Sequence, residues 1–298
     1  MRNLQANAPP LILDCDASVL PLGKAEIRLS LQEWQERVRF GATLGDFARF
    51  SAHLDACLPD GNKYGWVFTG SGDFHHLTLY LLRRLAAREK LPPASLDLIV
   101  CDNHPDNMRY PFGLHCGSWV RHAAALPCIR HIHVLGITSA DIGIGHAWEN
   151  NLTPLWQKKL GYWSIGVRAS WLSLLGRGGQ ARAFDSADAL LAAFLPVLKA
   201  SRALYLSLDK DVLHPQAARC NWDQGLFTPA HLEAVLRAAA EKIHGIDVCG
   251  DPSVYAYRSR FKRLLSRLDG QTIITPEELR AWQEEHRRLN LRLLEAIK

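Results

Sequence analysis

The chain has 298 residues, 48% of them hydrophobic, and a formal net charge of +5 at pH 7. This length fits one large α/β domain or two small ones, and one domain over 1–298 is favoured because no Pro-, Gly- or Ser-rich linker and no internal repeat divides the chain. The positive charge is spread over arginine-rich helical stretches instead of forming one stripe, so the composition does not favour a nucleic-acid partner.

Cysteines and apolar runs indicate the compartment. The seven cysteines are irregularly spaced and form no CxxC pair, which fits reduced intracellular thiols better than a disulfide framework. The apolar run at 11–13 is too short for the core of a signal peptide, and no uncharged run has the length of a membrane span. We therefore expect a cytoplasmic protein without a membrane partner.

The first predicted elements are a strand and a helix. The strand, over 10–15, ends in Asp14 and Asp16, which we interpret as turn residues because no histidine accompanies them. Helical periodicity follows over 30–50, with Ser30 as the expected N-cap of a capping box. This segment predicts one helix before the next strand.

A strand–turn–helix unit comes next. The apolar run 64–69 predicts a strand, a glycine-containing turn follows it, and the periodic segment 77–89 predicts a helix. Because a helix of this length connects parallel strands, the unit predicts a parallel sheet. His75 and His76 stand at the start of the helix.

The next buried strand, over 96–101, runs directly into potential metal ligands. Asp102, His104 and Asp106 follow it at every second position, so an extended segment would direct all three side chains to one side. Two carboxylates and an imidazole offer hard oxygen and borderline nitrogen donors to a divalent cation. In a parallel sheet such residues lie at the carboxyl ends of the strands, where ligands bind.

A second acidic strand end follows the apolar run 203–208. It carries Asp209 and Asp211, so two strand ends together supply five oxygen or nitrogen donors. That is more than one tetrahedral zinc ion needs, and it suits a pair of divalent ions that share carboxylates. The other predicted elements alternate as in an α/β protein, with strands at 129–135, 163–167 and 245–249 and helices at 119–125, 186–199, 228–242 and 275–297.

The last predicted unit is a C-terminal helical extension over 255–298, with a break near Asp269 and Gly270. We interpret it as helices that cover an edge of the sheet. His131 and His133 alternate along an apolar strand, and we interpret both as core or interface histidines rather than ligands.

Three segments resemble, in order, the motifs of a known enzyme family. They are Gly-Asp-Phe-His-His at 72–76, Asp-Asn-His-Pro-Asp at 102–106 and Ser-Leu-Asp-Lys-Asp-Val-Leu-His-Pro at 207–215, and they look like those of the ureohydrolases, the arginase and agmatinase family. The resemblance implies a three-layer α/β/α fold with a mainly parallel, arginase-like sheet. It also implies two Mn²⁺ ions, with metal ligands at His75, Asp102, His104, Asp106, Asp209 and Asp211.

The resemblance further implies a reaction on a small-molecule substrate. A hydroxide that bridges the two ions would attack the trigonal carbon of an amidine, guanidine or amide and so hydrolyse a linear C–N bond. His115 matches in placement the family's loop histidine that relays protons, and Asp106 or Asp211 would take the proton of the water. His75 is preferred to His76 as the ligand because Leu77 then begins the buried face of the helix. Assembly into a homo-oligomer is left open.

The chain departs from the family's pattern beside the first predicted ligand. Phe74 separates Asp73 from His75, whereas the family has its Asp directly before this His. A residue that orients a metal-bound histidine from behind contributes to metal affinity. The source of that support for His75 is therefore left open.

A second departure concerns the substrate. The stretch 246–252 lacks the Glu that grips the substrate guanidinium in arginases and agmatinases, and a Cys or Gly falls in its place. Asp247 or Asp251 could replace that Glu only with a shorter reach. Because a buried guanidinium without a carboxylate is costly, we predict that arginine is a poor substrate. A short or neutral amide or amidine, held by Asn107, His115 or the 221–225 loop, should be a better one.

Two functions of other kinds remain open. The pair His75-His76 and the Asp102 and His104 spacing also suit a mononuclear zinc deacetylase on the related fold, although such an enzyme would not need the remaining acids. The missing Glu also permits a non-catalytic, metal-stabilised binding protein. The number of bound ions would distinguish the first alternative, and turnover of any C–N substrate would exclude the second.

Overall fold

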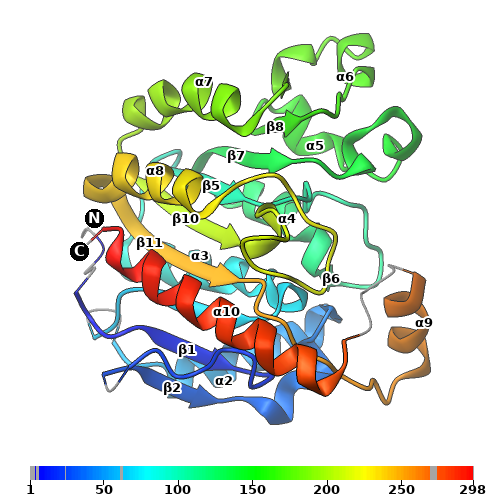
Figure 1. Ribbon diagram of the computed structural model, residues 1–298. Coiled ribbons are helices and arrows are strands. Elements are labelled where there is room, and N and C mark those ends of the chain that lie inside the picture. Colours follow the sequence, from blue (N-terminus) through cyan, green and yellow to red (C-terminus); the bar gives the residue numbers. More distant parts are fainter. Residues whose placement is uncertain (1–3, 5–6, 24, 61–62, 269–273, 298) are drawn as a thin grey trace.

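The structure, a computed structural model, describes residues 4, 7–23, 25–60, 63–268 and 274–297. Within them a nine-stranded sheet runs through the molecule in the order β2-β1-β4-β11-β10-β5-β7-β8-β9, and all neighbouring strands are parallel (Figure 1). The strands are β1 (Leu11–Asp14), β2 (Ile27–Ser30), β4 (Val67–Gly70), β5 (Leu96–Cys101), β7 (Ile129–Ile137), β8 (Leu160–Ile165), β9 (Ala181–Phe184), β10 (Leu204–Asp209) and β11 (Ile243–Cys249).

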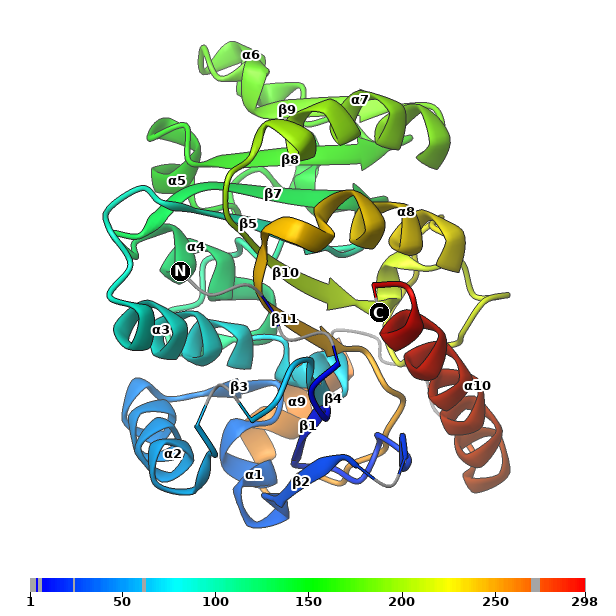
Figure 2. The same ribbon diagram turned by 90° about the vertical axis from the view of Figure 1, so that its left-hand side faces the viewer.

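Helices cover both faces of this sheet, as Figure 2 shows, with α2, α3 and α4 on one side and α7, α8 and α10 on the other. Side chains alternate along each strand, so Leu98 and Val100 enter the first core while Ile99 and Cys101 enter the second. The predicted three-layer α/β/α architecture is confirmed. The helices are α1 (Gln35–Val38), α2 (Leu44–Cys57), α3 (Leu77–Glu89), α4 (Trp119–Ala124), α5 (Leu152–Trp156), α6 (Trp171–Leu174), α7 (Ala187–Ala200), α8 (Pro229–Ala239), α9 (Arg260–Leu268) and α10 (Pro276–Glu295).

The single helix predicted over 30–50 is wrong. Ser30 is the last residue of β2, and after the short α1 the chain reverses at Phe40, which has φ +68°. Beside this reversal the Arg39 guanidinium is buried, with Nε 2.7 Å from Asp73 Oδ2. This tertiary ion pair outweighs the helical propensity of the segment, so α2 begins only after Thr43, whose side chain caps it.

Elsewhere the predicted elements agree with the structure to within a few residues, and 96–101 coincides with β5. The edge strands β2 and β9 were not predicted. Asp14 is the last residue of β1 and Asp16 lies in the turn after it; their side chains accept hydrogen bonds from Ala17 N and Ser18 N, as expected of residues that form a turn. No helix in the described ranges is long and apolar enough to span a membrane.

The C-terminal extension contains α9 and α10, and the break expected near Asp269 and Gly270 lies outside the described residues. α10 packs into the second core through residues such as Leu289 and Leu293, so it covers a face of the sheet rather than an edge. The buried Lys210 fixes it there. Lys210 Nζ lies 2.6 Å from Asp251 Oδ2 and 2.9 Å from Asn290 Oδ1 of α10.

Four adjacent strands position the candidate site. β4, β11, β10 and β5 lie side by side in the middle of the sheet, and their carboxyl ends open toward the same edge. Ligand-bearing loops in parallel sheets gather at this edge. The small antiparallel sheet of β3 (Gly41–Ala42) and β6 (Leu114–His115) lies next to it and brings His115 close.

Candidate metal centre

A cavity of about 560 Å³ opens at the carboxyl ends of the central strands. It contains all the predicted ligands, because β4 leads to His75, β5 leads to Asp102 and β10 ends at Asp209. Its wall combines acidic and histidine side chains with apolar ones. The lining residues are Gly72, His75, Asp102, His104, Pro105, Asp106, Met108, His115, Cys116, Gly117, Ser139, Ala140, Asp141, His146, Glu149, Asn150, Asp209, Asp211, Trp222 and Asp223.

The first ligand group surrounds His75 Nδ1. This atom lies 2.8 Å from Asp106 Oδ2, 3.2 Å from Asp102 Oδ2 and 3.5 Å from Asp209 Oδ2. All four side chains are buried. Three carboxylate oxygens therefore approach one imidazole nitrogen from three strand ends, and His75, Asp102 and Asp106 among them form a donor set close enough together for one divalent cation.

The second ligand group surrounds His104 Nδ1. This atom lies 2.9 Å from Asp211 Oδ2 and 3.6 Å from Asp102 Oδ1. On its far side, His104 Nε2 lies 2.7 Å from Asp223 Oδ1. A carboxylate that engages the outer nitrogen of a histidine fixes the ring so that the inner nitrogen faces a metal. Asp102 belongs to both groups.

The charge of the centre fits divalent cations. Four carboxylates, those of Asp102, Asp106, Asp209 and Asp211, lie buried around two imidazoles. Burial, and then the neighbouring carboxylates Asp209 and Asp102, raise the pKa of Asp211 well above its usual value. Such an uncompensated cluster of buried negative charge is costly unless cations neutralise it. The residues present therefore suit a bound pair of metal ions.

His75 rather than His76 points into this cluster. His76 is also fully buried, but its ring lies against Phe47, with 6.1 Å between ring centroids, and it does not line the cavity. Burial lowers the pKa of His76 well below its usual value, so it stays neutral within the core. The structure thus places the preferred histidine among the carboxylates.

A buried hydrogen-bond chain supports His75 from behind. His75 Nε2 lies 3.0 Å from Ser207 Oγ, and Ser207 Oγ donates to Asp247 Oδ1 over 2.7 Å. Thr78 and Tyr205 also donate to Asp247, at 2.9 and 2.7 Å. Because the Ser207 proton is used on Asp247, its oxygen accepts the proton of His75 Nε2. With a metal bound, this arrangement would leave the lone pair of Nδ1 for the ion; in metal-free protein burial lowers the pKa of His75, but Asp106 and Asp102 outweigh it and raise that pKa well above its usual value.

Asp106 is held in a constrained geometry. Its backbone has φ +46°, a left-handed conformation that is uncommon outside glycine. Trp119 Nε1 donates to Asp106 Oδ2 over 2.6 Å, and Val120 N donates to the Asp106 carbonyl. The start of α4 therefore fixes this carboxylate beside His75.

His115 lies on the wall of the cavity, outside both ligand groups. Gly117 N donates to His115 Nδ1 over 2.9 Å, and the ring packs against Phe40 and Tyr110. Burial, followed by the positive charge of Lys262, lowers the pKa of His115 to about 3. The ring is therefore neutral at physiological pH and carries its proton on Nε2.

Several expectations about substrate contacts are wrong. Asn107 is buried and its amide donates to Asn151 O and Tyr162 Oη, so it does not line the cavity. Asp247 is committed to the chain behind His75, and Asp251 to Lys210. Neither aspartate is available as a replacement for the missing Glu.

Sequence reasoning also missed residues that complete the centre. Asp223 and Trp222 belong to the 221–225 loop, which was expected to contact the substrate, but the contact of Asp223 with His104 was not foreseen. The Ser207 hydroxyl was not singled out, although its place in the third motif was a signal. Cys249 was noted only as a substitute for Glu, whereas its sulfur lies 3.0 Å from Asp209 Oδ2.

Comparisons with known proteins identify the fold. No model of a known protein family matches the chain. An uncharacterised protein of Thermotoga maritima is 30% identical over 200 residues, which are 67% of this chain and 62% of that relative. The matched region therefore spans less than two thirds of the relative's length.

Solved structures extend the comparison over nearly the whole chain. Formimidoylglutamase from Bacillus subtilis superimposes with a TM-score of 0.56 at 12% identity, covering 99% of this chain and 89% of that one. Proclavaminate amidino hydrolase from Streptomyces clavuligerus gives 0.52 at 15%, covering 99% and 97%. Arginase from Bacillus caldovelox gives 0.50 at 16%, covering 90% and 100%. The chain has the arginase fold, as the three motifs predicted.

Proposed function

We propose that this chain, having the arginase fold, is a metal-dependent hydrolase that binds two divalent ions and cleaves a linear C–N bond of an amidine, guanidine or amide. Asp102 is the observation that carries the proposal. Its Oδ2 lies 3.2 Å from His75 Nδ1, while its Oδ1 lies 3.6 Å from His104 Nδ1. A carboxylate between two donor groups is what a pair of ions requires and one ion does not.

The donor set supports the choice of metal. His75, Asp102 and Asp106 would hold one ion, with Asp209 as a further ligand 3.5 Å from His75 Nδ1, and Asp102, His104 and Asp211 would hold the other. Carboxylate oxygens predominate, which favours Mn²⁺ over softer cations at the His104 group. When bound, two such ions lower the pKa of a water molecule toward neutrality and so supply a nucleophile at physiological pH.

The chain's own residues would then bind the substrate and accept a proton. We assign Asp106 as the acceptor of the water's proton, as the resemblance to the ureohydrolases implies; in metal-free protein burial and the adjacent Asp102 raise its pKa to about 7. His115 faces the same cavity and holds its proton on Nε2, so it would donate a hydrogen bond to the substrate. Because the His115 ring is neutral, we propose that it acts as a hydrogen-bond donor to the substrate instead of relaying protons as an imidazolium.

The cavity also bears on the substrate class. No carboxylate stands at the end of β11, where the guanidinium-binding Glu of arginases would be. Asp141, Glu149 and Asp223 do line the wall, but Glu149 is paired with His146 and Asp223 with His104. We therefore propose that the carbon attacked belongs to an amide or amidine. Any positive charge on the substrate would lie nearer the acidic side chains of the cavity wall.

The test combines metal counting with a substrate panel. Elemental analysis of protein refolded with excess Mn²⁺ should give two ions per chain. Ammonia and urea release should then be measured with guanidino acids, agmatine-like amines, formimino compounds and simple amides. Asp102→Ala should lose both ions and all turnover. The matched control is Asp97→Asn, a buried aspartate at the other end of β5 that pairs with Arg130. It should retain both ions.

Each other outcome has a definite meaning. One tight ion without a second would contradict the binuclear proposal and favour a mononuclear zinc enzyme. Two ions without turnover of any compound would favour a metal-stabilised binding protein. Efficient urea release from arginine would overturn the substrate class while leaving the metal centre intact.

A further inference from the structure

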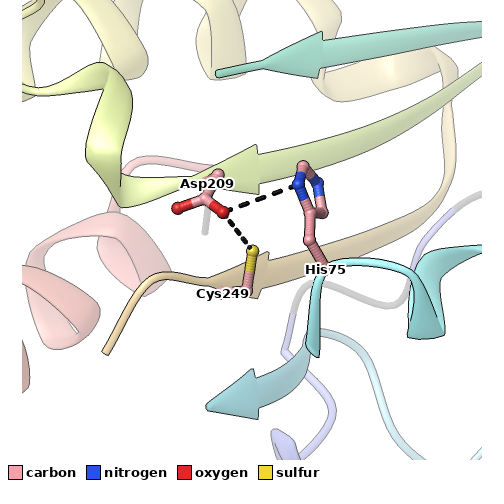
Figure 3. A group of neighbouring side chains, drawn as sticks. All are labelled: His75, Asp209 and Cys249. Carbon is pink, nitrogen blue, oxygen red and sulfur yellow. Dashed lines mark hydrogen bonds and ion pairs between the residues drawn. The ribbon is translucent and has the colours of Figure 1, made fainter. Parts of the chain in front are cut away.

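Cys249 lies next to the first ligand group. Figure 3 shows it beside Asp209 and His75. Its Sγ lies 3.0 Å from Asp209 Oδ2, and the same oxygen lies 3.5 Å from His75 Nδ1. The three donor atoms lie within 4.8 Å of one another, and all three residues are buried. Sulfur, oxygen and nitrogen are thus close enough to contact one ion.

The backbone is built to bring this sulfur to the centre. Cys249 is the last residue of β11 and lies opposite Asp209 in the register of β10. Gly250 follows with φ +89°, and a Cβ at this position would lie 2.5 Å from Asp209 Oδ1. Only glycine allows the strand to turn this closely around Asp209. The approach of residue 249 to the carboxylate is therefore fixed by the fold.

We propose that the Cys249 thiolate is a ligand of the ion held by His75 and Asp209, which makes the two halves of the centre chemically different. The proposal rests on the binuclear function proposed above and deepens it. Thiolate is a soft donor that favours Zn²⁺, Fe²⁺ or Co²⁺, whereas the His104 group contains only oxygen and nitrogen donors that accept Mn²⁺. The His75 position would therefore select a softer cation than its neighbour.

The other six cysteines sharpen this assignment. Among the described residues, Cys249 is the one cysteine that belongs to a group able to hold a metal. Cys101 is equally buried and directly precedes Asp102, yet it faces the core between the sheet and α7 and α8. Burial alone therefore does not explain why the sulfur of Cys249 meets a ligand carboxylate. In metal-free protein its thiol donates a hydrogen bond to Asp209 Oδ2, and a bound cation would draw the thiolate in its place.

The test uses Co²⁺ as a spectroscopic probe on the full chain. Wild-type protein loaded with two Co²⁺ ions should show a near-ultraviolet thiolate-to-cobalt charge-transfer band. Cys249→Ser keeps a hydroxyl that can donate to Asp209 but is a poor metal ligand, so the band should be lost. Zn²⁺ affinity of this variant should fall by at least about tenfold, while Mn²⁺ affinity should change little. Cys128→Ser, a buried cysteine at the opposite end of the sheet before β7, is the matched control and should keep the band.

Wild-type protein that binds two Co²⁺ ions without the band would overturn the proposal and leave the binuclear hydrolase standing. A band that persists in Cys249→Ser would also overturn it. Failure of the wild type to bind cobalt, zinc or manganese would instead remove the proposed function together with this inference. X-ray absorption of the zinc-loaded wild type needs no variant and should show a Zn–S distance of roughly 2.3 Å.

Discussion

The Ser207→Ala variant tests the hydrogen bond that orients His75 without changing any proposed metal ligand. The change removes an oxygen that lies 3.0 Å from His75 Nε2 and 2.7 Å from Asp247 Oδ1. It introduces no new polar group and no bulk. The His75 ring would then keep its contacts with the carboxylates but lose the acceptor that fixes its Nε2 proton.

The magnitude follows from what is left unpaired. A buried N–H without an acceptor costs about 1–3 kcal/mol, so the free energy of unfolding should fall by this amount. Loss of a residue that orients a metal-bound histidine typically costs about 10–100-fold in metal affinity, or about 1.4–2.7 kcal/mol. The loss should be confined to the ion held by His75. The His104 group has its own support from Asp223 and should bind unchanged.

Stepwise metal titration by calorimetry would measure both affinities. Ser164→Ala is the matched control, because Ser164 is also a buried strand serine, and it donates to Val167 O away from the centre. It should lower stability without weakening either ion. Wild-type affinity for both ions in Ser207→Ala would refute the argument that the Ser207 and Asp247 chain orients His75.

Three further outcomes are expected. His115→Ala should retain two ions and lose about tenfold in turnover, the value of one hydrogen bond of about 1.4 kcal/mol, and a variant that empties the site would show that the residue is a ligand instead. In metal-free protein, burial and neighbouring carboxylates raise the pKa of Asp211, and Asp211 outweighs burial to raise the pKa of His104, so both bind protons more tightly in the folded state. Their stabilisation is complete below about pH 4 and about pH 6.5, respectively, and is lost as pH rises. The melting temperature with chelator should therefore drop further below that with saturating metal between about pH 5 and pH 8, because buried neutral histidines such as His76 and His115 act equally in both samples; a gap that narrows as pH rises would contradict this. Lys210→Met leaves Asp251 as a buried, unpaired charge and should cost about 3–5 kcal/mol in urea unfolding, part of which Asp251→Asn should restore; equal stability of Lys210→Met and wild type would count against the buried pair.

The sequence was sufficient to predict the structure where a local pattern of residues is compatible with a single type of element. The run 96–101 is apolar, of strand length, and bounded by prolines on one side and Asp102 on the other, and β5 has these limits. Because all carboxyl ends of parallel strands share one edge, the strand ends predicted that His75, Asp102 and Asp209 would lie together. Their distances of 3.2 and 3.5 Å from His75 Nδ1 agree with that geometric rule.

The sequence was insufficient where distant side chains decide the structure. Arg39 breaks the helix expected over 30–50 because its partner Asp73 comes from another part of the chain. The pairing of Ser207 with His75 likewise joins positions that no periodicity relates. The strand β2 did carry a local signal, since apolar and polar residues alternate over 27–30, but helical periodicity in the following residues obscured it.

The place of β11 in the sheet has a consequence for how the protein is made. β11 is the last strand in the described part of the chain, yet it pairs with β4 on one side and β10 on the other, in the middle of the sheet (Figure 2). Before β11 emerges from the ribosome, the sheet consists of two separate parts. One part contains β2, β1 and β4, and the other contains β10, β5, β7, β8 and β9. Each part has an unpaired edge where β11 will insert. Such non-local pairing is slow and leaves intermediates prone to aggregate.

His75 comes from the β4 side of that gap, and Asp102 and Asp209 from the other. The ligands can meet only after β11 has inserted, so metal binding during refolding should appear with the slowest phase seen by circular dichroism, and binding in an earlier phase would contradict this order. A metal ion bound by ligands from both sides of β11 would then hold the two parts of the sheet together around this final strand. Metal supply would in this way set how often the inserted strand reopens and returns the chain to its aggregation-prone state, not how fast the strand inserts.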